Sequence, residues 1–227
     1  MQNNYLETLE NIILSENVVD NFYNQYNKYN DFHNWLNSFI PEIEKCEKQQ
    51  QNTPWHKYNV LGHILHSIEE MNKCTHDLPY NDRRLLAYTM LFHDIGKPDC
   101  HIVREKNGKL VDSFFNHNIR SCEIAKELLP KLNFNQEEIS IILKLVHKHD
   151  IFMFIKLNKH NNPYWRELNF DLIQEEILDL NQVGDGLQLL KYLVLVGRCD
   201  NLAQNELMTA DSLAMLDKFD QMLETLS

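Results

Sequence analysis

An apolar stretch that ends in two adjacent metal-ligand residue types constrains this chain most. The segment that starts at Leu91 reads Leu-Phe-His-Asp-Ile-Gly-Lys-Pro. Its apolar residues continue a helical pattern, and the glycine and proline favour a helix end directly after His93 and Asp94. A helix that ends in an imidazole and a carboxylate can direct both side chains at one ion.

Further imidazoles and one further carboxylate lie in similar settings elsewhere in the chain. They are His63, His117, His147, His149 and Asp200. Mixed imidazole and carboxylate sites suit Fe, Mn, Zn or Ni more than Ca. All of these residues lie in or beside predicted helices, and a helical bundle can bring such side chains into one pocket.

Each candidate also has an ordinary structural alternative. His63 can be a core histidine, and Lys97 can be a solvated lysine. Asp200 follows an apolar run that would bury it, and a buried carboxylate without a partner is costly. A metal ion removes that cost, but so does an ion pair with Arg198.

Length and composition favour a mostly helical domain. The chain has 227 residues, 43% of them hydrophobic, with only six glycines and six prolines for tight turns. The formal net charge of -11 should repel nucleic-acid backbones, so we expect no duplex-binding surface. A nucleotide substrate is still compatible with this charge, because a local metal site can overrule the overall sign.

Cysteines and apolar runs bear on the compartment. The five cysteines are odd in number and form no Cys-x-x-Cys pair, which favours a reducing compartment. The longest apolar stretches are far shorter than the ~20 residues that a bilayer requires, and no signal segment opens the chain. We therefore expect a cytoplasmic protein with no membrane partner; its oligomeric state is left open.

The pattern divides the chain into two parts. Apolar spacing of three and four over residues 1–40 predicts short amphipathic helices, and a polar stretch follows at 47–54. We expect residues 1–50 to form a helical extension packed on the core and residues 51–227 to form the domain that carries the motifs.

The second part is predicted to be an all-α bundle with one small β-hairpin near 101–115. Asn107-Gly108 between two short apolar runs is a strong hairpin signal. Helices are predicted at about 117–129 and 136–149, across Asp200, and at 210–226, with a loop or lid at 157–169.

Several of these segments, in this order, resemble the HD superfamily of metal-dependent phosphohydrolases. The matching segments are Pro54 to His63, Leu91 to Pro98, Phe114 to His117, Leu145 to His149 and Arg198 to Gln204. The context resembles most closely the HD domain of bacterial CCA-adding tRNA nucleotidyltransferases and its stand-alone relatives. We expect the polymerase head to be absent, since no Gly-Ser run followed by Asp-x-Asp precedes the domain, and the resemblance does not extend to CCA addition.

The resemblance implies a metal site for one or two divalent ions, with Mn, Fe, Ni, Co, Zn and Mg as candidates. The implied ligands of the first ion are His63, His93, Asp94 and Asp200. In members with two ions, Asp94 bridges, and His117 and His149 complete the second site. His149 fits the Leu-Val-x-x-His spacing better than His147, and the two point roughly 200° apart on a helix. The family often has glycine where Asn116 stands here.

The expected activity is hydrolysis of a phosphate ester by a metal-activated water. Asp94 and Lys97 are the expected catalytic residues, and Lys97, His56 and Asn59 are the expected substrate contacts. His56 and Asn59 would share a face with His63 if residues 56–63 were helical.

The expected substrate is a nucleotide or nucleic-acid end, either a phosphomonoester or a 2′,3′-cyclic phosphodiester. Two alternatives are open: a regulatory module that binds nucleotides without turnover, and a di-iron oxygenase of HD type.

Overall fold

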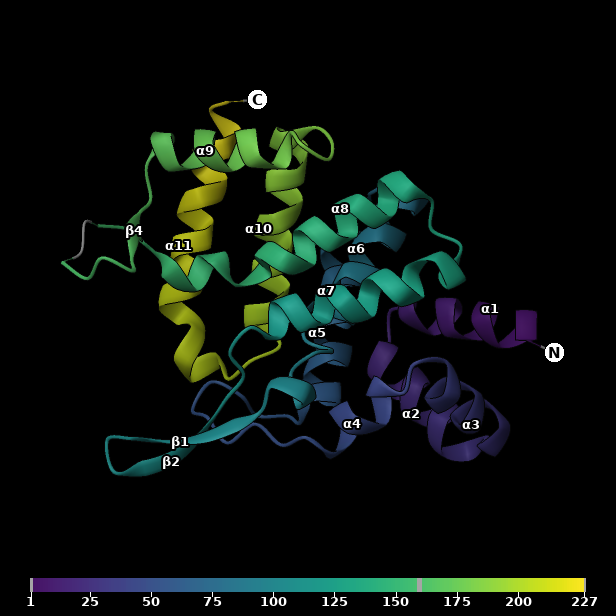
Figure 1. Cartoon of the computed structure of the whole chain (residues 1–227). Coiled ribbons are helices and arrows are strands. Elements are labelled where there is room, and N and C mark those ends of the chain that lie inside the picture. The colour runs from purple at the N-terminus through teal and green to yellow at the C-terminus, as the bar shows by residue number, and fades with distance from the viewer. Residues whose placement is uncertain (1, 159–160, 227) are drawn as a thin grey trace.

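The computed structural model describes residues 2–158 and 161–226, and its architecture is a bundle of helices (Figure 1). This confirms the predicted all-α class. The α-helices are α1 (Gln2–Ile13), α2 (Val18–Lys28), α3 (Asn30–Phe39), α4 (Glu42–Lys48), α5 (Val60–Cys74), α6 (Tyr80–His93), α7 (His117–Leu128), α8 (Gln136–Lys148), α9 (Phe170–Leu180), α10 (Gly186–Leu202) and α11 (Glu206–Glu224). Short 3₁₀ turns are η1 (Pro98–Cys100), η2 (Leu129–Leu132) and η3 (His149–Phe154).

The predicted hairpin is present and projects from the helical body. It pairs β1 (Ile102–Lys106) with β2 (Lys109–Ser113) in antiparallel register, with Lys106 opposite Lys109. Asn107 (φ 54°) and Gly108 (φ 74°) both adopt the left-handed conformation that a tight two-residue hairpin turn requires. The Asn-Gly signal therefore gave both the element and its turn.

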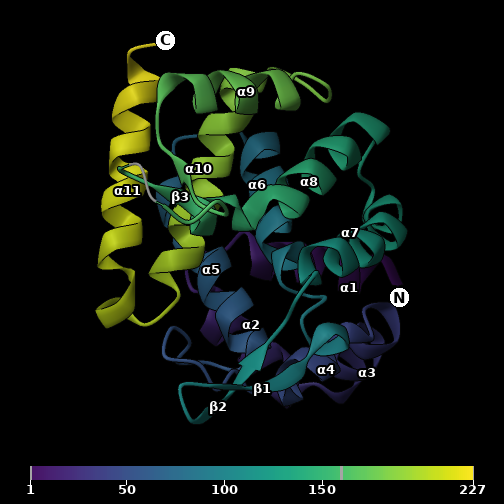
Figure 2. The same cartoon turned by 60° about the vertical axis from the view of Figure 1, so that its left-hand side comes forward.

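The N-terminal helices α1–α4 cover one end of the bundle, towards the lower right in Figure 1, and α2–α4 lie at the base of Figure 2. Their buried residues, such as Phe22, Phe32 and Leu36, belong to the same hydrophobic cluster as those of the later helices. The buried Asn72 of α5 donates to the carbonyls of Ile13 and Ser15, both at 2.7 Å, which ties α1 to α5. The domain boundary near residue 50 stays a prediction.

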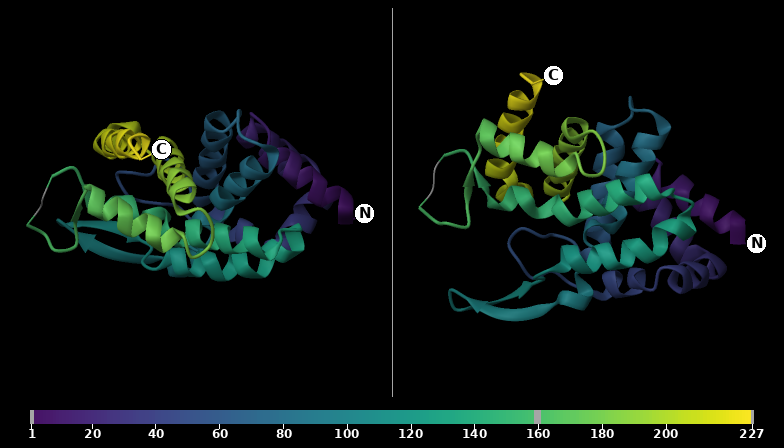
Figure 3. Two further views of the ribbon diagram at one scale, coloured as in Figure 1. Left: turned by 90° about the horizontal axis from the view of Figure 1, so that it is seen from above. Right: turned by 45° about the horizontal axis from the view of Figure 1, so that its top comes forward.

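Residues 157–169, predicted to be a loop, include a short strand. Ile155–Lys156 (β3) pairs in parallel with Arg166–Glu167 (β4), and residues 159–160 lie outside the described ranges. Helix α9 then follows, an element that the sequence analysis did not predict. Asn169 caps it by accepting from the Leu172 amide at 2.9 Å, so its start signal was present in the sequence. In Figure 3 this segment and the hairpin project on the same side of the bundle.

Across the described ranges, no helix combines the length and apolar character that crossing a bilayer requires.

Candidate metal centre

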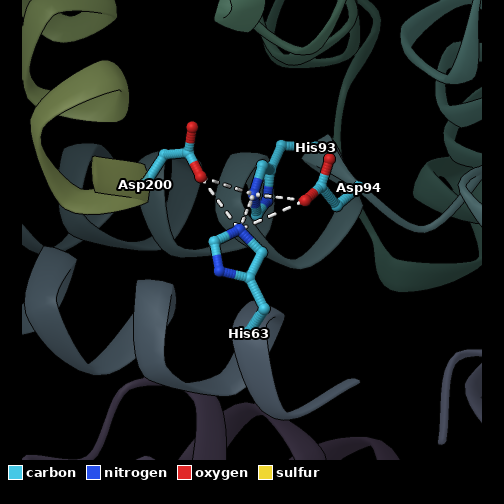
Figure 4. Close-up of side chains that lie close together, drawn as sticks. All are labelled: His63, His93, Asp94 and Asp200. Atoms are coloured by element: carbon cyan, nitrogen blue, oxygen red, sulfur yellow. Dashed lines mark hydrogen bonds and ion pairs between the residues drawn. The ribbon is translucent and has the colours of Figure 1, made fainter. Parts of the chain in front are cut away.

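Four side chains from three helices converge on one point inside the bundle (Figure 4). We call them the first ligand group: His63, His93, Asp94 and Asp200. His63 Nε2 lies 2.8 Å from Asp200 Oδ1 and 3.2 Å from Asp94 Oδ2. His93 Nε2 lies 3.3 Å from His63 Nε2 and 3.4 Å from Asp94 Oδ2.

Local sequence explains how each of these side chains is placed. Helix α6 ends at His93, and Asp94 is its C-cap residue with φ −114° and ψ 1°, so the dyad stands where the helix stops. His63 lies in the first turn of α5, whose N-cap Asn59 accepts a hydrogen bond from the Gly62 amide at 2.7 Å. Asp200 lies in the last turn of α10. Two helix ends and one helix start thus meet.

A second ligand group shares Asp94 and adds His117 and His149. Asp94 Oδ1 is 3.1 Å from His117 Nε2 and 3.6 Å from His149 Nε2, and these two nitrogens are 3.1 Å apart. The two carboxylate oxygens of Asp94 therefore face different ligand groups, as a bridging carboxylate would.

The second group depends on two unusual backbone positions. Asn116, directly before His117, is left-handed with φ 62°, a conformation that asparagine tolerates better than most residues and that suits the glycine of the related family. Gly96 brings α7 close to the dyad: a Cβ there would lie 2.6 Å from the His117 carbonyl oxygen. The Gly96 amide donates to Ser121 Oγ at 2.9 Å.

Each histidine is anchored through its other ring nitrogen. The Nδ1 atoms of His93, His117 and His149 lie 2.6, 2.8 and 2.7 Å from the carbonyl oxygens of residues 90, 114 and 146. His63 Nδ1 makes a longer contact of 3.4 Å with the Ala203 carbonyl. A carbonyl only accepts, so Nδ1 carries the proton and Nε2 is free to be a ligand.

This arrangement fits a divalent metal better than a metal-free core. Two pairs of Nε2 atoms face each other at 3.3 and 3.1 Å, and at most one proton can lie within each pair. Asp94 Oδ2 is buried and has cationic neighbours, yet no donor is aligned with it as a hydrogen bond. Inward imidazole nitrogens, together with a buried carboxylate oxygen that lacks an aligned donor, suit first-row divalent ions.

The carboxylates and imidazoles of the cluster perturb one another strongly. Burial alone would raise the pKa of Asp94 and Asp200, but cationic neighbours and hydrogen bonds hold both well below their usual range. Burial alone would lower the pKa of His63 and His149, but nearby carboxylates outweigh it and raise each to about 9. Without an ion, Asp94 and Asp200 are thus ionised, and His63 and His149 are protonated at neutral pH.

Lys97 is buried beside the dyad rather than solvated. Its Nζ lies 2.6 Å from Asp94 Oδ2, 3.0 Å from Gln51 Oε1 and 3.4 Å from His56 Nε2. Burial and the charges of Lys97 and His63 lower the pKa of His56 to about 2, so this imidazole is neutral. Gln51 was missed because no motif includes it.

The side chain of Asn59 caps the start of helix α5. Its side-chain oxygen accepts from Gly62, and its nitrogen donates to the Glu47 carbonyl at 2.8 Å. Helix α5 begins at Val60, so the premise that residues 56–63 form one helical face was wrong. The reason is physical: asparagine favours the position before a helix, where its side chain satisfies a free amide. A substrate contact at Asn59 stays a prediction.

The structure separates the alternatives that the sequence left open. His149 lies in the second group, whereas His147 is exposed, and its backbone carbonyl accepts from Asn118. Arg198 pairs with Asp217 and Asp220 at 2.7 Å each, so it is not the partner of Asp200.

Asp150 is a charged neighbour that the sequence analysis missed. Its Oδ2 lies 3.3 Å from His117 Nε2, and its Oδ1 lies 3.4 Å from His149 Nε2. The signal was available, because His149-Asp150 repeats the His-Asp pair of residues 93–94 at the end of another helix. This carboxylate is 27% exposed, unlike that of Asp94.

A family model described as HD domain matches residues 60–215, which include every member of both ligand groups. The chain belongs to the HD domain family. Proteins of this family are generally metal-dependent hydrolases that bind divalent metals, and the buried His/Asp cluster of this chain could hold such an ion.

Proposed function

We propose that this protein is a phosphohydrolase that acts on a nucleotide-type phosphomonoester or 2′,3′-cyclic phosphodiester. The observation that carries the proposal is the meeting of two ligand groups at the single carboxylate of Asp94. Kinship with the HD domain of CCA-adding enzymes, suggested by the ordered motifs, favours these ester types. All five cysteines are free, which supports a cytoplasmic setting as part of the same proposal.

In this proposal each ligand group holds a divalent ion, and Asp94 belongs to both. A bound ion there would lower the pKa of a coordinated water towards neutrality and offset negative charge on the phosphate. The residues that would hold the first ion are His63, His93, Asp94 and Asp200, and those for the second are Asp94, His117 and His149.

Asp94 has a second role in orienting the nucleophile. Its pKa lies well below the usual range, so the carboxylate is ionised at neutral pH and accepts hydrogen bonds. A water that donates to this fixed carboxylate is held in one orientation, which favours attack in line with the leaving oxygen. The same carboxylate would accept the proton that the water gives up.

Lys97 and His56 supply the polar environment beside the dyad. The Lys97 ammonium is a fixed positive charge that stabilises negative charge developing on phosphate oxygens nearby. Because an ammonium only donates, His56 Nε2 accepts from Lys97, and His56 Nδ1 donates to Thr53 Oγ1 at 2.6 Å. Neutral His56 therefore positions the Lys97 ammonium by accepting a hydrogen bond and adds no charge of its own.

The test combines metal analysis with a substrate screen. The purified protein is analysed for bound metal and is then incubated with nucleotide monoesters, cyclic nucleotides and diesters in Mn²⁺, Ni²⁺, Co²⁺ or Mg²⁺. Metal-dependent release of phosphate or of a ring-opened monoester supports the proposal. Nucleotides bound but recovered unchanged would instead indicate a sensing module, and oxygen uptake by the iron-loaded protein would indicate an oxygenase.

A further inference from the structure

Two exposed aromatic rings on the surface lie next to cationic side chains of the hairpin. The Arg104 guanidinium carbon is 4.9 Å from the centre of the Phe115 ring, and Lys106 Nζ is 5.7 Å from that of Trp55. Phe115 is 57% exposed and Trp55 is 41% exposed. We call these four residues the hairpin patch.

Core packing does not account for this hairpin. Every residue of β1 is exposed, and a lone two-stranded hairpin is only marginally stable in water. It is held at its base, where Asp112 accepts from His101 at 2.8 Å and from the Asn52 amide at 2.7 Å. Beyond that base the hairpin presents apolar side chains to solvent, as interaction surfaces do.

The hairpin patch lies on segments that lead directly to residues of the metal centre. Trp55 directly precedes His56, whose ring lies 5.6 Å from that of His63. The backbone carbonyl of Trp55 accepts from the Asn205 amide at 2.7 Å, so its ring is exposed on a fixed segment. Phe115 stands two residues before His117 of the second ligand group. Both rings are therefore carried by segments that continue into the cluster.

The local charge is opposite to that of the whole molecule. On the hairpin, Arg104, Lys106 and Lys109 outnumber Glu105 and Asp112, and Asp112 is already paired with His101. The chain as a whole has a formal net charge of -11. A partner that suits cations interleaved with exposed rings is a flexible polyanion with planar groups, which is the chemistry of a single nucleic-acid strand.

We propose that the hairpin patch binds single-stranded nucleic acid, with bases stacked on Trp55 and Phe115 and phosphates near Arg104 and Lys106. The terminal phosphate of the bound strand then lies at the metal centre. This inference rests on the proposed function and narrows its substrate to the end of a single strand. Bases stack on rings of this kind without sequence preference, so the selection is for strand type and not for sequence.

Binding is measured apart from turnover. A fluorescein-labelled ten-nucleotide RNA of mixed sequence, its DNA equivalent and the matching duplex are titrated with the full chain in the presence of a chelator, and anisotropy is followed. Hydrolysis of bis(p-nitrophenyl) phosphate with Mn²⁺ is measured in parallel, because this small ester carries no strand that could extend along the hairpin. A protein that binds the strand but cleaves no ester contradicts the proposed function and leaves the hairpin patch standing.

Two variants remove different parts of the interaction. Trp55→Ala with Phe115→Ala should weaken single-strand binding at least about tenfold and leave its salt dependence unchanged. Arg104→Ala with Lys106→Ala should weaken binding and lower the slope of log K against log salt by about 1.4, since each phosphate contact contributes about 0.7 for single strands. Both should cleave the small ester at the unaltered rate.

Matched controls keep the test decisive. Lys126→Ala with Lys131→Ala removes two exposed lysines from α7 and η2 and should leave strand binding unchanged. Trp55→Phe and Phe115→Tyr keep a ring and should retain most of the affinity, which separates stacking from a folding defect. The proposal is overturned if the wild type binds no single strand at micromolar concentration, if the duplex binds equally well, or if the control pair loses as much as the hairpin variants.

Discussion

The two ligand groups differ in how the fold supports them, although they share one carboxylate. The first group stands on three helices that pack on one another, α5, α6 and α10, and its histidines are nearly inaccessible. The second group stands at the start of α7 and just past the end of α8, beside Asp150, whose carboxylate is 27% exposed. One group stands within packed helices, and the other stands at helix termini next to a partly exposed carboxylate.

This difference predicts which ligand group binds its metal ion more tightly and which one exchanges its ion more readily. Ligands fixed by helix packing need no reorganisation to hold an ion, so we expect the first group to fill at lower metal concentration. The second group stands at helix termini beside Asp150, which is 27% exposed, so we expect its ion to exchange more readily. The predictions below test this asymmetry.

Asp94→Ala should have the largest effect because it removes a ligand from both groups at once. We expect turnover to fall by at least about 10³-fold, the order that is lost when a group stabilising transition-state charge is removed. Metal content measured by mass spectrometry should fall at both sites, with helical content by circular dichroism retained. Asp200→Asn is the comparison and should empty only the first site. Equal loss of both ions from Asp200→Asn would argue against two separable groups.

His149→Ala should come next and should affect the second group alone. Loss of this ligand should lower turnover about 10²-fold while the first ion stays bound. His147→Ala, two residues away and exposed, is the matched control and should change turnover little. The reverse ranking would exchange the roles of the two histidines.

The local patterns that predicted the elements also predicted much of the cluster, but not its surroundings. The His93-Asp94 pair, the Asn107-Gly108 turn and the helix through Asp200 are each encoded within a few residues, so a sequence can reveal them. Whether distant helices meet depends on tertiary packing. The order of the motifs along the chain predicted that the side chains of the two ligand groups meet, as they do in the structure. The spacing of apolar residues did not predict it.

What the sequence did not reveal follows the same division. The contact of Lys97 with Gln51 joins the segment after α6 to the loop before α5, and nothing near either residue indicates it. The shared helical face of His56, Asn59 and His63 does not form, because helix α5 begins only after its cap residue Asn59. Asp150 had a local signal, because the His149-Asp150 pair follows a helix as the His93-Asp94 pair does.

Metal affinity should rise with pH in both groups. In the metal-free protein His63 and His149 each have a pKa of about 9, so each holds a proton at neutral pH that an ion must displace. Affinity should therefore increase by up to about tenfold per pH unit for each proton released, and should level off above the pKa of about 9. Calorimetry in buffers of different ionisation enthalpy counts the protons. Affinity that is constant from neutral pH upwards would contradict these raised pKa values.

Asp150→Asn should have the smallest effect and should separate the two groups most finely. The substitution keeps the size of the side chain but removes the negative charge 3.3 Å from His117 Nε2 and 3.4 Å from His149 Nε2. We expect the second ion to bind about tenfold more weakly, as when a supporting carboxylate beside a metal ligand is lost, and the first to bind unchanged. Asp185→Asn, at the N-cap of α10, is the control for loss of one acidic group. If Asp150→Asn weakened the first ion as much as the second, the two groups would act as one unit and the contrast between them would not hold.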